Sequence, residues 1–163
     1  MKALAPAERL RHVISFTNHY LVETHSDANM FATVFIGIFD LQKGALTFIN
    51  GGNEPPLMWR QGGAVSALQP TGPVVGMIPG ANFSAREITL EKSDLLLAFT
   101  DGIPDARNTE NDFFGTERLL ELLNGGETTP AALLKDIEAR LRQFVGSADQ
   151  FDDITLLAVK KDS

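Results

Sequence analysis

The sequence predicts an α+β fold built on mostly antiparallel sheets. A helical pattern opens the chain, several short apolar segments joined by Gly- and Pro-containing turns follow, and two helical patterns precede a last apolar segment. Runs of strands beside separate helices are typical of α+β folds, whereas alternating strands and helices would favour a parallel sheet. The 163 residues suit one core, and we expect a single domain over residues 1–163.

The first elements follow from local periodicity. Residues 7–23 predict an amphipathic helix. Its expected apolar face is Leu10, Val13, Ile14, Thr17, Tyr20 and Leu21. Residues 30–40 are so dense in Phe, Val and Ile that they predict a strand buried on both faces.

Turn residues then divide the middle of the chain. Glycines predict two hairpins, over residues 30–50 and 57–68. An apolar loop that packs inward is expected over residues 71–80, followed by strands over 81–90 and 94–100.

The last third predicts two helices and a closing strand. A short helix over 113–123 is stopped by glycine. Thr129 offers a capping oxygen before a helix from Pro130 to about residue 145. An apolar run predicts the final strand over 154–160.

Composition excludes several classes of function. The chain has 14 basic and 21 acidic side chains, a formal charge of −7, which argues against binding to nucleic-acid phosphates. It has no cysteine, so disulfides and thiolate chemistry are excluded. With no apolar run long enough for a membrane span and no secretory signal pattern, we expect a soluble, cytoplasmic protein without a membrane partner.

Two acidic segments border predicted strands. Asp101 and Gly102 follow the apolar strand that ends at residue 100, and Asp152-Asp153 precede the last strand. Carboxylates held at strand ends suit a hard cation such as Mg²⁺ or Mn²⁺. The alternative is that these residues only form turns, a common role for Asp.

An ordered set of motifs resembles the SpoIIE-type serine phosphatases, which belong to the metal-dependent protein phosphatase (PPM, type 2C) superfamily. The resemblance runs from about Asn18 to Val159. The motifs are MFATVFIGIFD, INGGNEPPL, TGPVVGM, SDLLLAFTDGIPDARN, FFGTERL and FDDITLLAV. The T-D-G segment followed at a distance by D-D-I-T is the most specific pair.

The resemblance implies an α-β-β-α sandwich holding two Mn²⁺ or Mg²⁺ ions, with a metal-activated water that attacks the phosphorus of phosphoserine or phosphothreonine. Asp101 resembles the metal ligand of T-D-G, and Gly102 would allow the close turn there. Asp152 and Asp153 match the acidic pair of the last motif. Asp105 matches an acidic position that helps place metal-bound water. No side chain of this chain is assigned as a nucleophile.

Two departures from the family pattern matter. Asn53 replaces the His of the family's A-G-H-x-P-P segment, which keeps hydrogen bonding but loses titration. The G-D strand and D-x-S-G-H-G segment, whose Asp bridges both metals, have no counterpart upstream of Met30. We therefore expect an N-terminally truncated form of the fold, the C-terminal part of a phosphatase domain, with weak or single metal binding and little turnover.

The expected partner is a phosphoserine-containing regulatory protein, by family implication an anti-sigma factor antagonist. A second interpretation is a non-catalytic module that binds the same partner, and a third is an unrelated α+β binding domain. Because missing strands would leave sheet edges or an apolar face uncovered, we also expect a homodimer.

Overall fold

The computed structural model describes residues 4–24, 30–125, 129–150 and 152–162. The chain forms two compact units. The first unit is Met1–Pro55 with Leu68–Leu90, and the second is Pro56–Ala67 with Glu91–Ser163. Each unit combines helix with antiparallel sheet, so the predicted α+β class is confirmed.

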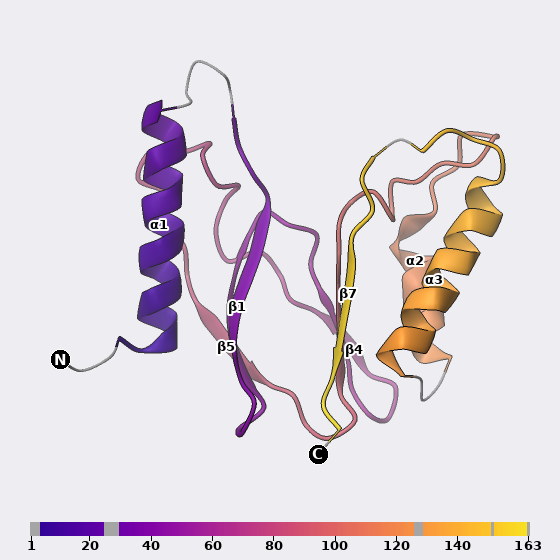
Figure 1. The fold of residues 1–163 in the computed structure, drawn as a ribbon, viewed down its shortest axis with the longest axis horizontal. Helices are drawn as coiled ribbons and strands as arrows, with labels where there is room; N and C mark the ends of the chain where they lie inside the picture. The colour runs from indigo at the N-terminus through magenta and orange to yellow at the C-terminus, as the bar shows by residue number, and fades with distance from the viewer. Residues whose placement is uncertain (1–3, 25–29, 126–128, 151, 163) are drawn as a thin grey trace. The chain divides into compact units, whose positions relative to one another are not determined.

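The first unit places one helix beside a three-stranded sheet (Figure 1). Helix α1 spans Pro6–Thr24, and the strands are β1 (Val34–Asp40), β2 (Ala45–Gly51) and β5 (Arg86–Thr89). The order in the sheet is β1-β2-β5, with every pair antiparallel, as the predicted first hairpin requires. Its buried cluster contains Leu10, Ile14, Ile49, Val75 and Phe83, and Val75 lies in the loop that was predicted to pack inward.

The buried face of α1 differs from the predicted one. Its buried residues are Leu10, Ile14 and Asn18. Val13 and Tyr20, both predicted inward, are 49% and 51% exposed. Asn18 can be buried because both ends of its amide are hydrogen-bonded: Nδ2 donates to the carbonyl of Ile78 (3.0 Å) and Oδ1 accepts from the N–H of Gly76 (2.8 Å). An apolar pattern cannot anticipate a buried amide with distant partners.

Strand β1 corrects a second prediction. It begins at Val34 and is half-buried along its length, with Gly37 exposed, rather than buried on both faces. The physical reason is its place in the sheet: among the strands that the structure describes, β1 lies at the edge and has β2 on one side only, so fewer neighbouring side chains cover it.

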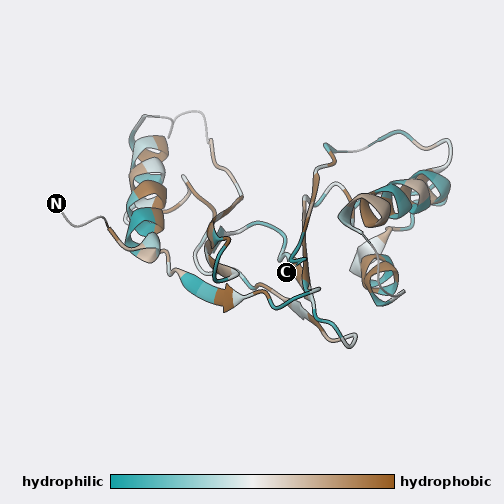
Figure 2. Cartoon of the chain, turned by 60° about the horizontal axis from the view of Figure 1, so that its bottom comes forward, coloured by the Kyte–Doolittle hydropathy of each residue, from teal (hydrophilic) through white to brown (hydrophobic). Residues whose placement is uncertain are grey.

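The second unit is a four-stranded antiparallel sheet with two helices packed on it. Its strands are β3 (Leu57–Trp59), β4 (Val65–Ala67), β6 (Leu95–Phe99) and β7 (Leu156–Lys160), in the order β4-β3-β6-β7. Helices α2 (Gly115–Asn124) and α3 (Pro130–Val145) lie side by side near β7 in Figure 1. Figure 2 shows hydrophobic and hydrophilic stripes on the helices, as burial of one face requires. The core includes Leu97, Ile103, Phe114, Leu119, Leu133 and Ile137.

The predicted start of α3 is confirmed by its cap. The hydroxyl of Thr129 accepts from the N–H of Ala132 (3.2 Å), and Pro130 occupies the first turn. Within the part of the chain that the structure describes, no helix is both long and apolar enough to span a membrane.

Candidate metal centre

The two acidic segments leave the same edge of the second unit's sheet. Strands β6 and β7 pair antiparallel, and their last partners in this direction are Phe99 and Leu156. The end of β6 therefore lies beside the start of β7. The segment that holds Asp101 and the segment that holds Asp152 and Asp153 are brought together by this register.

Hydrogen bonds continue beyond the last strand pair. The N–H of Thr100 donates to the carbonyl of Thr155 (3.2 Å). The Thr100 hydroxyl donates to the carbonyl of Asp153 (3.0 Å) and accepts from the N–H of Thr155 (3.0 Å). The two segments are thus joined by both main-chain and side-chain bonds.

Gly102 lies directly against the second segment. A Cβ built on Gly102 would lie 2.4 Å from the carbonyl oxygen of Asp153 and 3.4 Å from that of Asp152. Its φ is outside the left-handed region, so the need for glycine comes from this close approach and not from a special backbone conformation. Gly102 itself is buried.

The carboxylates of the site are exposed at this edge. Asp101, Asp152 and Asp153 each lie at the surface. One oxygen of the Asp152 side chain accepts from the N–H of Asp153 (2.7 Å), and the Asp152 carbonyl accepts from Nε2 of Gln150 (2.8 Å). These bonds hold the main chain of the second segment while leaving carboxylate oxygen available to a ligand.

Asp105 lies one turn further along the first loop. Its N–H donates to the carbonyl of Asp101 (2.9 Å), and its side chain is exposed. The loop from Asp101 to Asp105 is therefore a hydrogen-bonded turn whose ends both carry carboxylates.

The donor set at this edge consists only of oxygen, which suits Mg²⁺ or Mn²⁺. Among the residues that the structure describes, no three carboxylate or imidazole side chains are grouped closely enough to hold a metal ion. A hard cation takes about six oxygen ligands or more. A cation bound between Asp101 and Asp152 would therefore draw most of its shell from water or from other groups.

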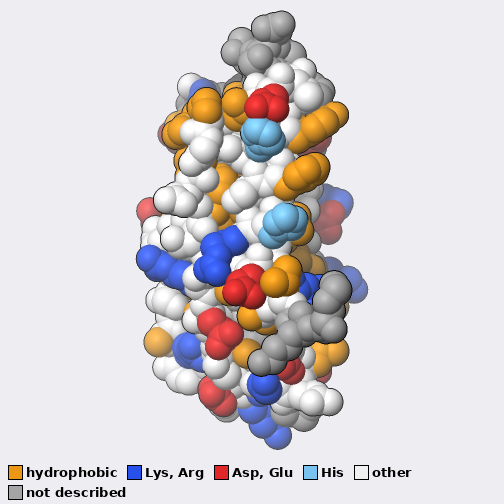
Figure 3. Space-filling model, turned by 90° about the vertical axis from the view of Figure 1, so that its left-hand side faces the viewer, with side chains coloured by type: hydrophobic (Ala, Val, Ile, Leu, Met, Phe, Trp, Pro, Cys, Tyr) orange, Lys and Arg blue, Asp and Glu red, His pale blue; other side chains and the backbone are white. Residues whose placement is uncertain are grey.

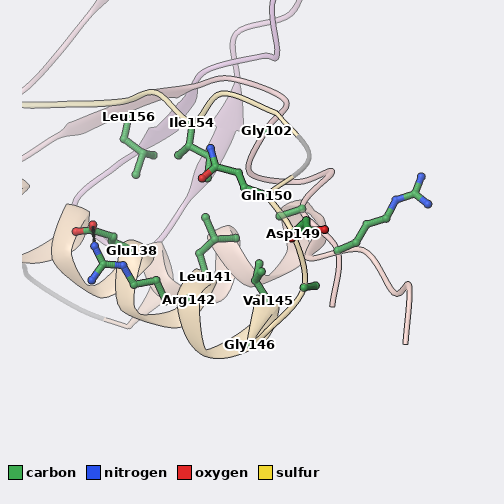
Figure 4. A pocket seen from close by; sticks show the side chains of 13 residues that line it. Gly102, Glu138, Leu141, Arg142, Val145, Gly146, Asp149, Gln150, Ile154 and Leu156 are labelled. Atoms are coloured by element: carbon green, nitrogen blue, oxygen red, sulfur yellow. Dashed lines mark hydrogen bonds and ion pairs between the residues drawn. The ribbon is translucent and has the colours of Figure 1, made fainter. Parts of the chain in front are cut away.

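A cavity of about 640 Å³ borders the same loop at Gly102 (Figure 4). Its lining is Gly102, Ala106, Arg107, Glu138, Leu141, Arg142, Val145, Gly146, Ala148, Asp149, Gln150, Ile154 and Leu156. Glu138 and Arg142 form an ion pair on its α3 side. Aliphatic walls beside charged groups are typical of surfaces that accept part of a polar ligand or a peptide.

Thr100 is a residue of this site that the sequence pattern did not single out. In the sequence it is the last residue of a predicted strand and the first residue of T-D-G. The signal that could have found it is the pair T-D-G and D-D-I-T at the ends of two strands: if those strands are antiparallel neighbours, the first Thr faces the second motif.

Asn53 belongs to the first unit and is bonded within its own loop. Its N–H donates to Oδ1 of the fully buried Asn50 (2.9 Å), and its Nδ2 donates to the carbonyl of Glu54 (2.8 Å). The Asn that replaces the family His thus helps to order this turn.

Comparisons with known proteins identify relatives over most of the chain. The family described as Stage II sporulation protein E (SpoIIE) matches residues 2–162. Protein IcfG of Synechocystis sp. is 36% identical over 148 residues, covering 91% of this chain and 23% of IcfG. The phosphoserine phosphatase RsbU of Bacillus subtilis is 28% identical over 143 residues, covering 86% of this chain and 42% of RsbU.

The solved SiaA-PP2C domain of Pseudomonas aeruginosa superposes with a TM-score of 0.80 at 18% identity, covering 93% of this chain and 61% of that one. This likeness shows the predicted PP2C-type fold. The chain spans less than half the length of IcfG and of RsbU.

Proposed function

The chain belongs to the SpoIIE family, and on that premise we propose that it contributes the β6–β7 metal centre of a protein-serine phosphatase. The observation that carries the proposal is the junction of the two acidic segments, at which Thr100 bonds to Asp153. Membership of the SpoIIE family relates the chain to PPM-type phosphatases. Metal binding at this edge of the sheet is our proposal.

Asp101 and Asp152 would hold the cation through their carboxylates. A bound Mn²⁺ or Mg²⁺ supplies an acidified water and offsets negative charge on a phosphoryl group. Gly102 allows the two carboxylate segments to approach each other, and Asp105 and Asp153 add negative charge at the same edge. Because negative charge is concentrated at this edge, binding of a divalent cation is favoured over binding of a phosphate without a cation.

The proposed substrate is phosphoserine on a small regulatory protein, an anti-sigma factor antagonist. Support comes from the 28% identity to a protein named as a phosphoserine phosphatase. The cavity beside Gly102 offers a surface for the polypeptide that carries the phosphoserine.

The test is Mn²⁺-dependent phosphate release from a phosphoserine protein by the purified chain. Asp101→Asn removes a charged ligand at nearly constant shape, and we expect it to abolish the release. The matched control is Asp136→Asn, an exposed carboxylate on α3. Equal release by wild type and Asp101→Asn would contradict the proposed role of this edge.

A second candidate function is a phosphatase-like binding module without turnover. It is favoured by the finding that the described residues contain no group of three metal-binding side chains. For this candidate we expect a phosphorylated partner to bind measurably and keep its phosphate in Mn²⁺. Phosphate release that depends on Asp101 would exclude it.

We further propose that weak or single occupancy by Mn²⁺ distinguishes this chain from a complete dinuclear site. Isothermal titration calorimetry gives both the stoichiometry and the affinity. Tight binding of two ions per chain would contradict the proposal.

Self-association is proposed through the exposed face of α1. Val13, Phe16 and Tyr20 follow the spacing of one helix face and are 49%, 67% and 51% exposed. Figure 3 shows hydrophobic side chains along this side of the molecule. Light scattering at micromolar concentration should give a dimer that Phe16→Glu dissociates, whereas Leu41→Glu, at a site already 83% exposed, should not. A monomeric wild type would refute the proposal.

A further inference from the structure

The Thr100 side chain connects the two acidic segments just beyond the paired ends of β6 and β7. Its hydroxyl is both a donor and an acceptor toward the segment before β7: it donates to the Asp153 carbonyl and accepts from the Thr155 N–H, each at 3.0 Å. Such double use fixes the rotation of the hydroxyl and gives both bonds a defined direction.

The residues on both sides of these bonds are the candidate ligands. Thr100 is followed directly by Asp101, and the Asp153 carbonyl is preceded directly by Asp152. The regular pairing of the strands stops at Phe99 and Leu156. Beyond that pair, one main-chain bond remains, from the Thr100 N–H to the Thr155 carbonyl (3.2 Å), and the hydroxyl adds two more bonds between the segments.

Gly102, which follows Asp101 in the sequence, lies against the same Asp153 carbonyl. The space for a Cβ at Gly102 is already taken by that oxygen, at 2.4 Å. The carbonyl is therefore held by a donor and enclosed by main chain, which makes it a fixed point of the loop and not a free ligand.

We infer that Thr100 is a positioning residue: its hydroxyl keeps the Asp101 and Asp152 segments in register so that one divalent cation binds both carboxylates. This inference rests on the proposed metal centre. Groups that orient metal ligands typically change affinity by about 10–100-fold when they are removed.

A purely structural role for Thr100 predicts a different result. Val has nearly the shape of Thr and a high strand propensity, so Thr100→Val keeps the packing of the half-buried side chain. Asp153 and Thr155 are exposed, and water can replace the lost bonds. We therefore expect the fold without metal to be little changed, and the loss to appear in metal affinity.

The experiment measures Mn²⁺ affinity by calorimetry and the melting temperature in chelator for each variant. We expect Thr100→Val to weaken Mn²⁺ binding by about tenfold or more, with the melting temperature in chelator close to wild type. Thr100→Ser restores the hydroxyl and should bind within about threefold of wild type. Thr17→Val, which removes the hydroxyl of an exposed Thr on α1, should bind like wild type.

Asp101→Asn separates the two proposals. Wild-type affinity in Thr100→Val, with weakened binding in Asp101→Asn, would overturn the positioning role and leave the metal centre standing. Wild-type affinity in both variants, or no Mn²⁺ binding by the wild type, would overturn the metal centre and the positioning role with it. If Thr100→Val does not fold, Thr100→Ala gives the same comparison, and equal affinity in Thr100→Ala and wild type overturns the inference.

Discussion

Gly102 and Asp153, fifty-one residues apart in sequence, meet so closely that a single added methyl group would overlap main chain. The 2.4 Å separation joins the Gly102 Cβ position to the Asp153 carbonyl oxygen. Main chain cannot rotate out of the way as a flexible side chain can. This contact therefore determines how near the loop after β6 comes to the segment before β7.

Gly102→Ala should lower the free energy of unfolding by about 1–3 kcal/mol, the usual cost of overpacking. In thermal unfolding, Gly102→Ala should therefore melt at a lower temperature than wild type. The control is Gly125→Ala, where φ is −68° and the nearest atom is 3.3 Å away. Equal melting temperatures for Gly102→Ala and wild type would show that the loop relaxes freely.

Asp94→Ala should destabilise the second unit. The Asp94 carboxylate is 2% exposed, pairs with Arg60, and accepts from the N–H groups of Gln61 and Glu91. The substitution leaves those donors without this acceptor, and we expect it to lower the free energy of unfolding by about 2–3 kcal/mol. This is below the ~3–5 kcal/mol lost when a fully buried ion pair is broken, because the Arg60 side chain is 40% exposed.

Urea unfolding followed by Trp59 fluorescence measures this change, because Trp59 is the only Trp of the sequence and lies in the same unit. Asp136→Ala, an exposed site on α3, is the control. Equal unfolding midpoints for Asp94→Ala and Asp136→Ala would show that the buried Asp94 carboxylate does not stabilise the fold.

Arg118→Lys should weaken the packing of α2 on α3. The guanidinium lies 4.5 Å from the ring centre of Phe144 and 5.6 Å from that of Phe114, and it donates to the carbonyls of Phe113 and Phe114. Lys cannot stack and donate in this way. We expect a loss of about 1 kcal/mol in chemical unfolding, and no comparable loss for Arg140→Lys at an exposed site.

Asp40 should contribute stability that acid removes. The N–H of Lys43 donates to its carboxylate and, with the N–H of Gln42, holds the pKa of Asp40 below its ordinary value of 3.8. A lowered pKa stabilises the folded state above pH 3.8, and this contribution is lost as the pH falls through the folded-state pKa. Wild type should exceed Asp40→Asn in stability at neutral pH, and the difference should vanish in strong acid. A difference that is constant with pH would contradict this.

Part of the candidate site could be predicted from sequence. Asp101 and Asp152 stand next to apolar strands, so their position at strand ends follows from local pattern. That the two strands are neighbours depends on the pairing of residues 95–99 with 156–160, which local periodicity does not contain. The role of Thr100 is hidden for the same reason, since its two bonds reach residues 53 and 55 positions away.

The sequence by itself determined the kinds and order of the elements, the acidic oxygen-donor character of the site and the family motifs, because these depend on residue type and short-range spacing. The tertiary structure alone decided which face of α1 is buried, because the partners of Asn18 lie about sixty residues away. It also decided that β1 is a half-buried edge strand and that Gly102 contacts Asp153. Burial and close approach depend on long-range packing, in which each residue's neighbours are set by the whole fold.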